Sequence, residues 1–392
     1  MASSLDYTEK LAIINVRVFD GQHFSEPRTV AIANGIIVET DDAIGAKVID
    51  GNEQFLLPGL IDAHIHLKDK STLRQMAEYG ITTGLDMATW PPSKLDPLRG
   101  CLGLTDIRSP GLPATCSGSI HSHILPIPQN GFVASPEDAA QFVQDRIMEG
   151  ADYIKVIADV PGPDQPTLNA LVAEAHKHKM LVVAHASSFT PFAMAQEAEA
   201  DIITHTPRDK ALDGENIARM VSSKCVSVPT LAMMEGVMKR PKLKAILRLM
   251  LSPAAFLAVI KAKRNNPHGG GQRYENARHS VKAMYDAGVP ILAGTDANAE
   301  PHAPFDLFHG ESLHHELELL VDAGLSTIDT LHAATSLPAK HFGLNDRGII
   351  EVGKRADIIL LARDPIQDIR ATRSIQRIWC GGIEVQKSLK LA

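Results

Sequence analysis

Short apolar runs recur through the middle of the chain, and stretches with apolar residues at helical spacing separate them. A strand, a helix and a second strand in that order form the unit of a parallel α/β sheet. Eight such runs match the architecture of a (β/α)8 TIM barrel. The expected strands are LIDAHIHL (60–67), TTGLDM (82–87), ATCSGSI (114–120), YIKVIAD (153–159), LVVAHA (181–186), IITHT (202–206), SVPTL (227–231) and ILAGTD (291–296).

Helices are expected between these runs. Residues 136–149 and 167–179 place apolar side chains at helical spacing, and SPEDA and DQPTL supply residues typical of a helix start. Residues 233–280 are longer than an ordinary connection between a strand and a helix. They predict either an extended outer helix pair or a lid over the mouth of the barrel.

Strand-like segments with alternating apolar residues and glycine-containing turns lie at both ends of the chain. We expect antiparallel strands that form one small sheet together. The predicted composite domain comprises residues 1–57 and 346–392, and the barrel comprises residues 58–345. The segments are KLAIINVRVFDG, TVAIANGIIVET and AKVIDGNEQFLLPG before the barrel, and DIILLAR and IQRIWCGGIEV after it.

The first barrel strand carries two histidines, His64 and His66, where a buried strand would otherwise stay apolar. Residues at positions i and i+2 of a strand share a face, so both imidazoles point the same way. Two imidazoles on one face form half of a divalent metal site. The alternative is a pair of hydrogen-bonded core histidines, because a motif this short has a high false-positive rate.

Further polar residues fall in or at the ends of later strands. In a (β/α)8 barrel the active site is built at the carboxyl ends of the strands, so these side chains are expected to meet at one mouth. Taken singly, each histidine could be a core residue, and the aspartate in GTDAN could begin a turn. Taken together, they predict a metal site. The residues are Lys155, His185, His205 and Asp296.

Lys155 is the residue that decides between one metal and two. Burial and a nearby divalent cation both disfavour an ammonium group, so the amine is expected to be neutral. A neutral amine can react with carbon dioxide to give a carbamate, an anion able to bridge two metals. The alternative is an ammonium paired with Asp152 or Asp159.

The chain resembles metal-dependent hydrolases of the amidohydrolase superfamily. It is most similar to the imidazolonepropionase-like and Xaa-Pro dipeptidase-like branch, which includes ochratoxinase-type amidases. The resemblance covers nearly the whole chain and implies a barrel with a small β-sandwich built from both termini. It rests on PGLIDAHIHL, GADYIKV, VVAHA, ITHT and AGTDA, and on the tail HHELELLVDAGLSTIDTLHAAT followed by RGIIEVGKRADIILL.

The resemblance also implies a binuclear centre, with zinc as the expected metal. His64, His66 and Asp296 would hold one ion, His185 and His205 the second, and carboxylated Lys155 would bridge them. These six residues form the implied ligand set.

Asp296 would also act as general base and then general acid while a bridging hydroxide attacks an amide. The alternatives are lactone or ester hydrolysis at the same site, and a mononuclear imidazolone-type hydrolase or deaminase. Deaminases of the superfamily usually show His-x-x-Glu after the fifth strand, which VAHASSFTPFAMAQE lacks. A metal-free relative that serves protein association would be expected to have lost ligands.

Five further residues are weaker candidates for substrate contact. His121 and His123 lie where family members often carry Gly-Gly-His, and a hydrogen-bonded loop is the alternative. Tyr153 precedes Lys155, and a packing role is the favoured alternative for it. Arg208 and Asn298 follow ligand-bearing strands and could bind a carboxylate or amide, or lie at the surface.

Composition limits the partners. The 392 residues carry a net charge of −7, with 44% hydrophobic and 22% charged residues, which is ordinary globular composition without a basic footprint for nucleic acid. No segment suggests membrane binding, and the polar start MASSLDYTEK lacks a secretory signal, so we expect a cytoplasmic protein. The four cysteines show no CxxC spacing. A small-molecule substrate is expected, and the resemblance implies a homo-oligomer.

Overall fold

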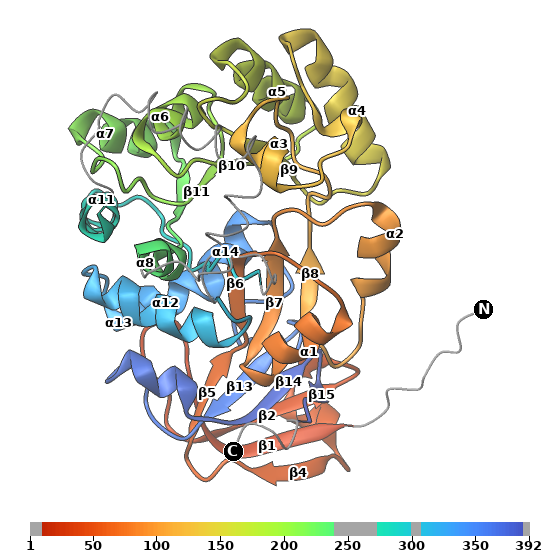
Figure 1. Ribbon diagram of the computed structural model, residues 1–392. Coiled ribbons are helices and arrows are strands. Elements are labelled where there is room, and N and C mark those ends of the chain that lie inside the picture. Colours follow the sequence, from red (N-terminus) through yellow and green to blue (C-terminus); the bar gives the residue numbers. More distant parts are fainter. Residues whose placement is uncertain (1–9, 239–272, 299–306, 387–392) are drawn as a thin grey trace.

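The computed structural model describes residues 10–238, 273–298 and 307–386. Strands from the two ends of the chain form a sheet at the bottom of the molecule in Figure 1, and the strands and helices of the central region lie above it. The fold is therefore an α/β barrel joined to a β-structure that both termini build.

The terminal sheet has eight strands in the order β15-β14-β13-β5-β1-β2-β3, and β4 pairs with β1. Tight turns form its hairpins, and Asn34 and Gly35 between β2 and β3 both have positive φ angles (52° and 77°), as this turn requires. The strands are β1 Leu11–Val18, β2 Arg28–Ala33, β3 Ile36–Val38, β4 Lys47–Asp50, β5 Phe55–Pro58, β13 Ile358–Leu361, β14 Ile375–Cys380 and β15 Ile383–Glu384.

The expectation of an all-antiparallel terminal sheet is only partly right. Strand β1 pairs in parallel with both β4 and β5. The β2–β3 hairpin lies between β1 and β4 in the sequence, so it acts as a crossover that returns the chain in the direction of β1. Alternating apolar residues identify strands but do not fix their relative direction.

Strand β1 connects the two parts of the terminal sheet, β2-β3 with β4 on one side and β5-β13-β14-β15 on the other. Its first half pairs with β2 and β4, its last residues pair with β5, and the register shifts near Asn15, whose φ is 53°. Apolar side chains from both halves form one core that includes Ile13, Val30, Leu56 and Trp379. The division into domains at residues 57/58 and 345/346 stays a prediction.

Seven barrel strands form two parallel sheets, β6-β7-β8 and β9-β10-β11-β12. Single parallel bridges extend these sheets: Ala114, beyond β8, pairs with Val156 of β9, and residues of the eighth segment pair with β12 and β6. The segments thus follow the strand order of a (β/α)8 barrel. The strands are β6 Leu60–Ile65, β7 Ile81–Asp86, β8 Asp106–Arg108, β9 Ile154–Ile157, β10 Val182–His185, β11 Ile202–Thr204 and β12 Val226–Val228.

The eighth barrel segment, residues 290–297, lies between β12 and β6. Its backbone hydrogen bonds run to Ser227 on one side and to Ala63, His64 and His66 on the other. Gly294 permits this close approach, because a Cβ atom there would lie 2.5 Å from Val228 Cγ1 and 2.9 Å from the His64 nitrogen. The segment therefore brings Asp296 beside the end of β6.

The third expected strand, residues 114–120, is wrong. The structure has its strand at β8, and Ala114 and Thr115 make only isolated bridges. Ser119 then caps a short helix, because its side chain accepts a hydrogen bond from the backbone N–H of Ser122. The serines and glycine of this segment favour a turn and a helix cap over a strand.

The helices cover the barrel (Figure 1). The two expected over residues 136–149 and 167–179 are confirmed, within a few residues, as a 3-10 turn with α4 and as α5. Residues 239–272 of the lid hypothesis lie outside the described residues. The helices are α1 Lys70–Glu78, α2 Pro92–Leu95, α3 Ile120–Ile124, α4 Ala139–Met148, α5 Gln165–Lys177, α6 Phe189–Glu197, α7 Gly214–Ser223, α8 Leu231–Met238, α11 Tyr274–Asp286, α12 Glu311–Asp322, α13 Thr327–Ala333 and α14 Ser336–His341.

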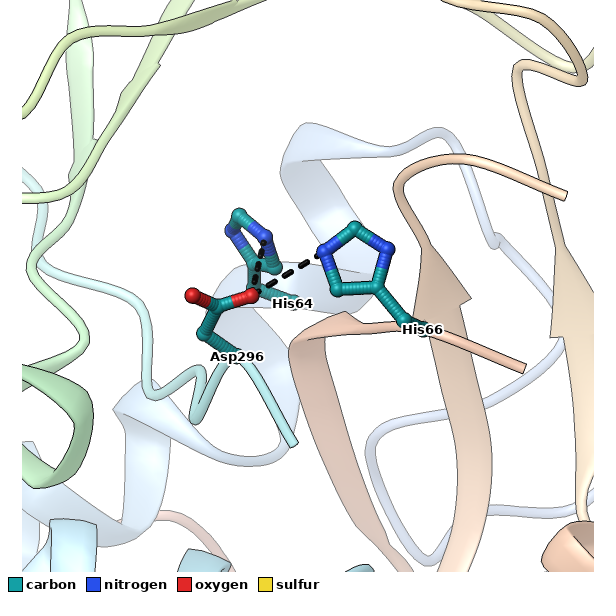
Figure 2. A group of neighbouring side chains, drawn as sticks. All are labelled: His64, His66 and Asp296. Atoms are coloured by element: carbon teal, nitrogen blue, oxygen red, sulfur yellow. Dashed lines mark ion pairs between the residues drawn. The ribbon is translucent and has the colours of Figure 1, made fainter. Parts of the chain in front are cut away.

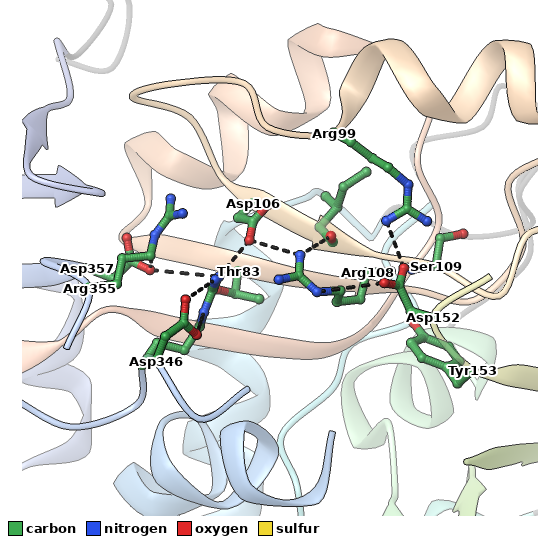
Figure 3. A network of polar contacts seen from close by, with 12 residues as sticks. Thr83, Arg99, Asp106, Arg108, Ser109, Asp152, Tyr153, Asp346, Arg355 and Asp357 are labelled. Carbon is green, nitrogen blue, oxygen red and sulfur yellow. Dashed lines mark hydrogen bonds and ion pairs between the residues drawn. The ribbon is translucent and has the colours of Figure 1, made fainter. Parts of the chain in front are cut away.

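A buried arginine, Arg347, connects the barrel with the terminal sheet, and Figure 3 labels its partners Thr83, Asp106, Asp346 and Asp357. Arg347 Nη1 lies 2.8 Å from Asp106 Oδ2 and 2.9 Å from the Thr83 hydroxyl, which belong to β8 and β7. The Nε atom of Arg347 lies 2.9 Å from Asp346 Oδ1. Its Nη1 atom lies 3.9 Å from Oδ2 of Asp357, the residue directly before β13. The Arg347 side chain is only 2% exposed, so removing it would leave the buried Asp106 and Asp357 with only Arg108 and Arg355 as partners.

Candidate metal centre

His64, His66 and Asp296 converge at the mouth of the barrel (Figure 2). The Nε2 atoms of His64 and His66 lie 3.3 Å and 3.0 Å from Asp296 Oδ1. His64 and His66 come from β6 and its end, as their shared strand face requires. Asp296 comes from the eighth segment, with a left-handed backbone (φ 60°) that is uncommon outside glycine. Such strained residues are found at functional sites.

The charges of this group are set by burial and by mutual contact. Burial lowers the pKa of His64 to about 4, so its ring is neutral at physiological pH. Burial would also lower the pKa of His66, but contact with Asp296 outweighs it and raises that pKa. Burial raises the pKa of Asp296, but the two imidazoles overcome this and hold it well below its usual range. Asp296 is therefore a carboxylate.

A second buried carboxylate fixes the position of this group. Asp62 Oδ1 accepts hydrogen bonds from the backbone N–H groups of His64 (3.2 Å) and Thr295 (3.1 Å), and Oδ2 accepts one from the Thr295 hydroxyl (2.8 Å). Burial raises the pKa of Asp62 to about 7. Asp62 thereby connects the strand that carries the histidines with the segment that carries Asp296.

His185 and His205 lie next to this group at the ends of β10 and β11. The His205 ring centroid is 4.8 Å from that of His64 and 4.5 Å from that of His185. The Thr230 hydroxyl lies 2.8 Å from His205 Nδ1, which leaves Nε2 to bind another group. Burial lowers the pKa of both histidines well below the usual value, so both rings are neutral, the form that binds metal.

Lys155 projects from β9 into the same region and is 4% exposed. Its Nζ lies 3.1 Å from the Thr204 hydroxyl and 3.6 Å from Met87 Sδ. Burial lowers the pKa of the amine to about 7. Among the described residues no carboxylate lies within ion-pair distance of Nζ, and Asp152 pairs with Arg99 instead. In the described ranges neither Asp152 nor Asp159 pairs with Lys155, and the lowered pKa makes the neutral amine accessible near neutral pH.

A second group of possible ligands consists of His121, Asp159 and His185. His121 Nδ1 lies 2.5 Å from Asp159 Oδ2, and the His121 and His185 rings are 4.5 Å apart. Asp159 Oδ1 lies 3.9 Å from His185 Nε2, a buried atom with no hydrogen-bond partner among the described residues. His121 thus lies beside His185 in the candidate metal site, and the sequence did not predict its contact with Asp159.

The other candidates for substrate contact are placed less favourably. His123 is exposed on α3. Tyr153 is buried, and its hydroxyl lies within hydrogen-bond distance of the carbonyl oxygens of Asp86 and Arg108, a placement that suits packing. Arg208 and Asn298 are half-buried, and Arg208 Nε and Asn298 Oδ1 have no partner in the described part of the chain.

Sequence reasoning missed several residues that support the site. Asp86, at the end of β7, accepts hydrogen bonds from the Leu67 N–H and the Thr89 hydroxyl. His309 Nε2 lies 2.8 Å from the His66 carbonyl oxygen and holds the chain that carries this histidine. The position of Asp86 after an apolar run is a signal that could have revealed it, whereas His309 is distant in sequence and gave none.

The donor set fits divalent transition metals. Imidazole nitrogens and carboxylate oxygens are the ligands of zinc and similar ions. In each of the two groups the ligand atoms all lie within 4.8 Å of one another. His64 Nδ1 and His185 Nε2 are buried without a hydrogen-bond partner among the described residues. Such orphaned atoms are costly unless something binds them.

Fold and site define an α/β barrel that gathers side chains able to bind a metal at the mouth of the barrel. The sequence pattern of the amidohydrolase family matches residues 122–385, more than half of the chain. The chain belongs to the amidohydrolase family.

The curated relatives include an adenine deaminase of Methylobacterium nodulans, 23% identical over 374 residues, 93% of this chain and 56% of that protein. An adenine deaminase of Methanothrix thermoacetophila is 21% identical over 362 residues, 89% of this chain and 54% of that protein. The chain therefore spans about half the length of these two relatives. An uncharacterized protein of Mycobacterium tuberculosis is 27% identical over 84% of this chain and 85% of its own.

Solved structures share the fold. A Xaa-Pro dipeptidase with bound methionine has a TM-score of 0.77 at 21% identity, covering 97% of this chain and 100% of that one. The ochratoxinase of A. niger has a TM-score of 0.72 at 19% identity, covering 97% and 96%. Among the described residues, no helix has the length and apolar character needed to cross a membrane.

Proposed function

We propose that the protein is a binuclear metal-dependent hydrolase of amide bonds in a peptide-like molecule, an N-acyl amino acid or a cyclic amide. The observation that carries the proposal is the convergence of His64, His66 and Asp296 at one mouth of the barrel. The first metal would be bound there, and the second by His185 and His205. Carboxylated Lys155 would bridge them, and its low pKa supports the neutral amine that carboxylation needs.

Two divalent ions, with zinc as the expected metal, would supply an acidified water and polarise the substrate carbonyl. Asp296 performs the proton transfers. Its carboxylate accepts a proton as the water oxygen bonds to the carbonyl carbon, and then delivers it to the departing nitrogen as the C–N bond breaks. The products are a carboxylic acid and an amine. The low pKa of Asp296 keeps it ready to accept that proton.

The similarity in fold to a Xaa-Pro dipeptidase and to ochratoxinase supports amide substrates. Lactone or ester hydrolysis would use the same residues. A second candidate is deamination, favoured by the adenine deaminases among the relatives. Deamination also breaks a C–N bond, but it releases ammonia.

A cytoplasmic location, zinc as the metal and a homo-oligomeric assembly remain parts of this proposal.

The test combines metal analysis with a substrate screen of the full chain. We expect about two metals per chain and amine release from dipeptides, N-acyl amino acids or lactams that stops on chelation. Asp296→Asn should slow hydrolysis about 10²–10⁴-fold, whereas Asp145→Asn, at a half-buried position on the outer helix α4, should not. Ammonia release from adenine alone would favour the deaminase. Metal-independent turnover, or no bound metal, would refute the proposal.

The carbamate has its own readout. Protein exchanged with ¹³C-labelled bicarbonate should show a carbamate carbon resonance in the NMR spectrum, and Lys155→Met should remove it. Methionine keeps nearly the volume of the lysine and adds no cavity beside Met87. No difference between the two spectra would reject the bridging role of Lys155.

A further inference from the structure

Two ligand sets meet at His185. On one side lies His205, with ring centroids 4.5 Å apart, and Lys155 lies near both. On the other side lies His121, whose ring centroid is also 4.5 Å from that of His185, and Asp159 is hydrogen-bonded to His121. One imidazole nitrogen binds one metal ion, so His185 can serve either set but not both with the same atom.

The carboxylates that act on Lys155 through their charge are Asp296, which belongs to the first group of ligands, and Asp86, so the position beside His185 and His205 has no anionic ligand of its own while the amine is not carboxylated. Lys155 Nζ contacts only the Thr204 hydroxyl and the Met87 sulfur among the described residues. A cation beside His185 and His205 would then have neutral ligands and an amine that can itself take up a proton. Ligand charge contributes strongly to the affinity for a divalent cation, so this position is weak without the carbamate.

The side of His121 already contains the anion. Asp159, at the end of the β9 segment, is 6% exposed, and its two oxygens face His121 (2.5 Å) and His185 Nε2 (3.9 Å). His185 Nε2 is buried and has no hydrogen-bond partner in the described ranges. A divalent ion between these side chains would bind that nitrogen and neutralise the carboxylate.

The spacing suits a metal. Ligand atoms of tetrahedral zinc, with bonds of about 2.0–2.2 Å, are roughly 3.3–3.6 Å apart. The ligand atoms of His121, Asp159 and His185 all lie within 4.8 Å of one another. Small rotations of the side chains would therefore complete three bonds, with the fourth position open to water or substrate.

We propose that the second metal ion has a binding position formed by His121, Asp159 and His185, which does not require the carboxylated Lys155. The inference rests on the proposed binuclear function and adds a second location for one of its two ions. His185 is the ligand common to both positions, so the ion moves toward Asp159 when the carbamate is absent.

The test uses the full chain with Lys155→Met, loaded with zinc alone. We expect two zinc ions per chain in this variant and one in Lys155→Met/Asp159→Asn. The matched control is Lys155→Met/His123→Asn, which changes a histidine on the same helix whose side chain is exposed, and it should retain two. Diffraction at the zinc edge should place the second peak within about 2.2 Å of His121 and Asp159.

One zinc in Lys155→Met, bound only by His64, His66 and Asp296, would overturn the inference. A second peak beside His205 and away from Asp159 would do so as well. If the variant does not fold, wild-type crystals grown in carbon dioxide-free buffer can be used instead, because Lys155 is then not carboxylated and the position of the second zinc peak can still be determined. The peak position is independent of turnover. If the bicarbonate-treated wild type hydrolysed none of the substrates, the proposed function would be refuted. The position of the second zinc ion would still decide the inference.

Discussion

Thr295 donates two hydrogen bonds to the Asp62 carboxylate. The Thr295 hydroxyl lies 2.8 Å from one carboxylate oxygen, and the Thr295 backbone N–H lies 3.1 Å from the other. The two residues are far apart in sequence, and their contact places Asp296 opposite His64 and His66. Asp62 is fully buried, so losing a donor would leave part of its carboxylate unsatisfied.

Thr295→Val should therefore weaken both folding and metal binding. We expect a loss of about 1–3 kcal/mol in the free energy of unfolding and a roughly 10–100-fold weaker metal affinity. Thr295→Ser keeps the hydroxyl and is the matched control. Chemical denaturation and zinc titration measure the two effects. Equal zinc affinity in the valine and serine variants would show that Asp62 does not position the ligands through this hydroxyl.

His66→Asn should remove a ligand of the first metal. Because changes around a ligand already cost about 10–100-fold in affinity, we expect at least about a 100-fold loss here. His123→Asn replaces an exposed histidine and should bind zinc as the wild type does. Competition with a chromogenic chelator gives the affinities. If both variants matched the wild type, His66 would not be a ligand.

Glu316 should make stability depend on pH. It accepts hydrogen bonds from the first backbone N–H groups of α8, Leu231 (2.9 Å) and Ala232 (2.6 Å), and burial raises its pKa to about 8 from 4.5. Between pH 4.5 and 8 the folded protein keeps this proton and the unfolded chain does not. Stability conferred by the protonated group is thus lost as the pH rises through this window.

The comparison is between wild type and Glu316→Gln, both metal-free. The free energy of unfolding of the wild type should fall relative to the variant by about 1.4 kcal/mol per pH unit. Urea denaturation from pH 5 to pH 8 measures this difference. A difference that stays constant over the range would mean that Glu316 has an ordinary pKa in the fold.

Arg347→Met should destabilise the junction between the barrel and the terminal sheet. Asp106 and Asp357 would lose this guanidinium but keep Arg108 (3.0 Å) and Arg355 (2.8 Å), so we expect a cost below the roughly 3–5 kcal/mol of breaking an isolated buried ion pair. Arg363→Met changes an exposed arginine and should cost less than about 0.5 kcal/mol. Urea denaturation of the two variants provides the measurement. Equal stability would show that the arginine network adds nothing to folding.

Periodic patterns in the sequence predicted much of the fold. The i, i+2 spacing of His64 and His66 placed them on one face of a strand, and helical spacing identified α4 and α5. The third strand failed because serine and glycine after Ala114 form a turn and a helix cap there. Local pattern also left the direction of β4 and β5 open, since pairing direction depends on the path between strands.

The sequence by itself determined the barrel class and which strands carry Lys155, His185 and His205, because strand and helix periodicity is local. The tertiary structure alone decided the contacts across the barrel, such as Asp62 with Thr295 and His121 with Asp159. These pairs join segments whose separation in the chain says nothing about their distance. Closure of the barrel brings them together, and burial then sets their charges.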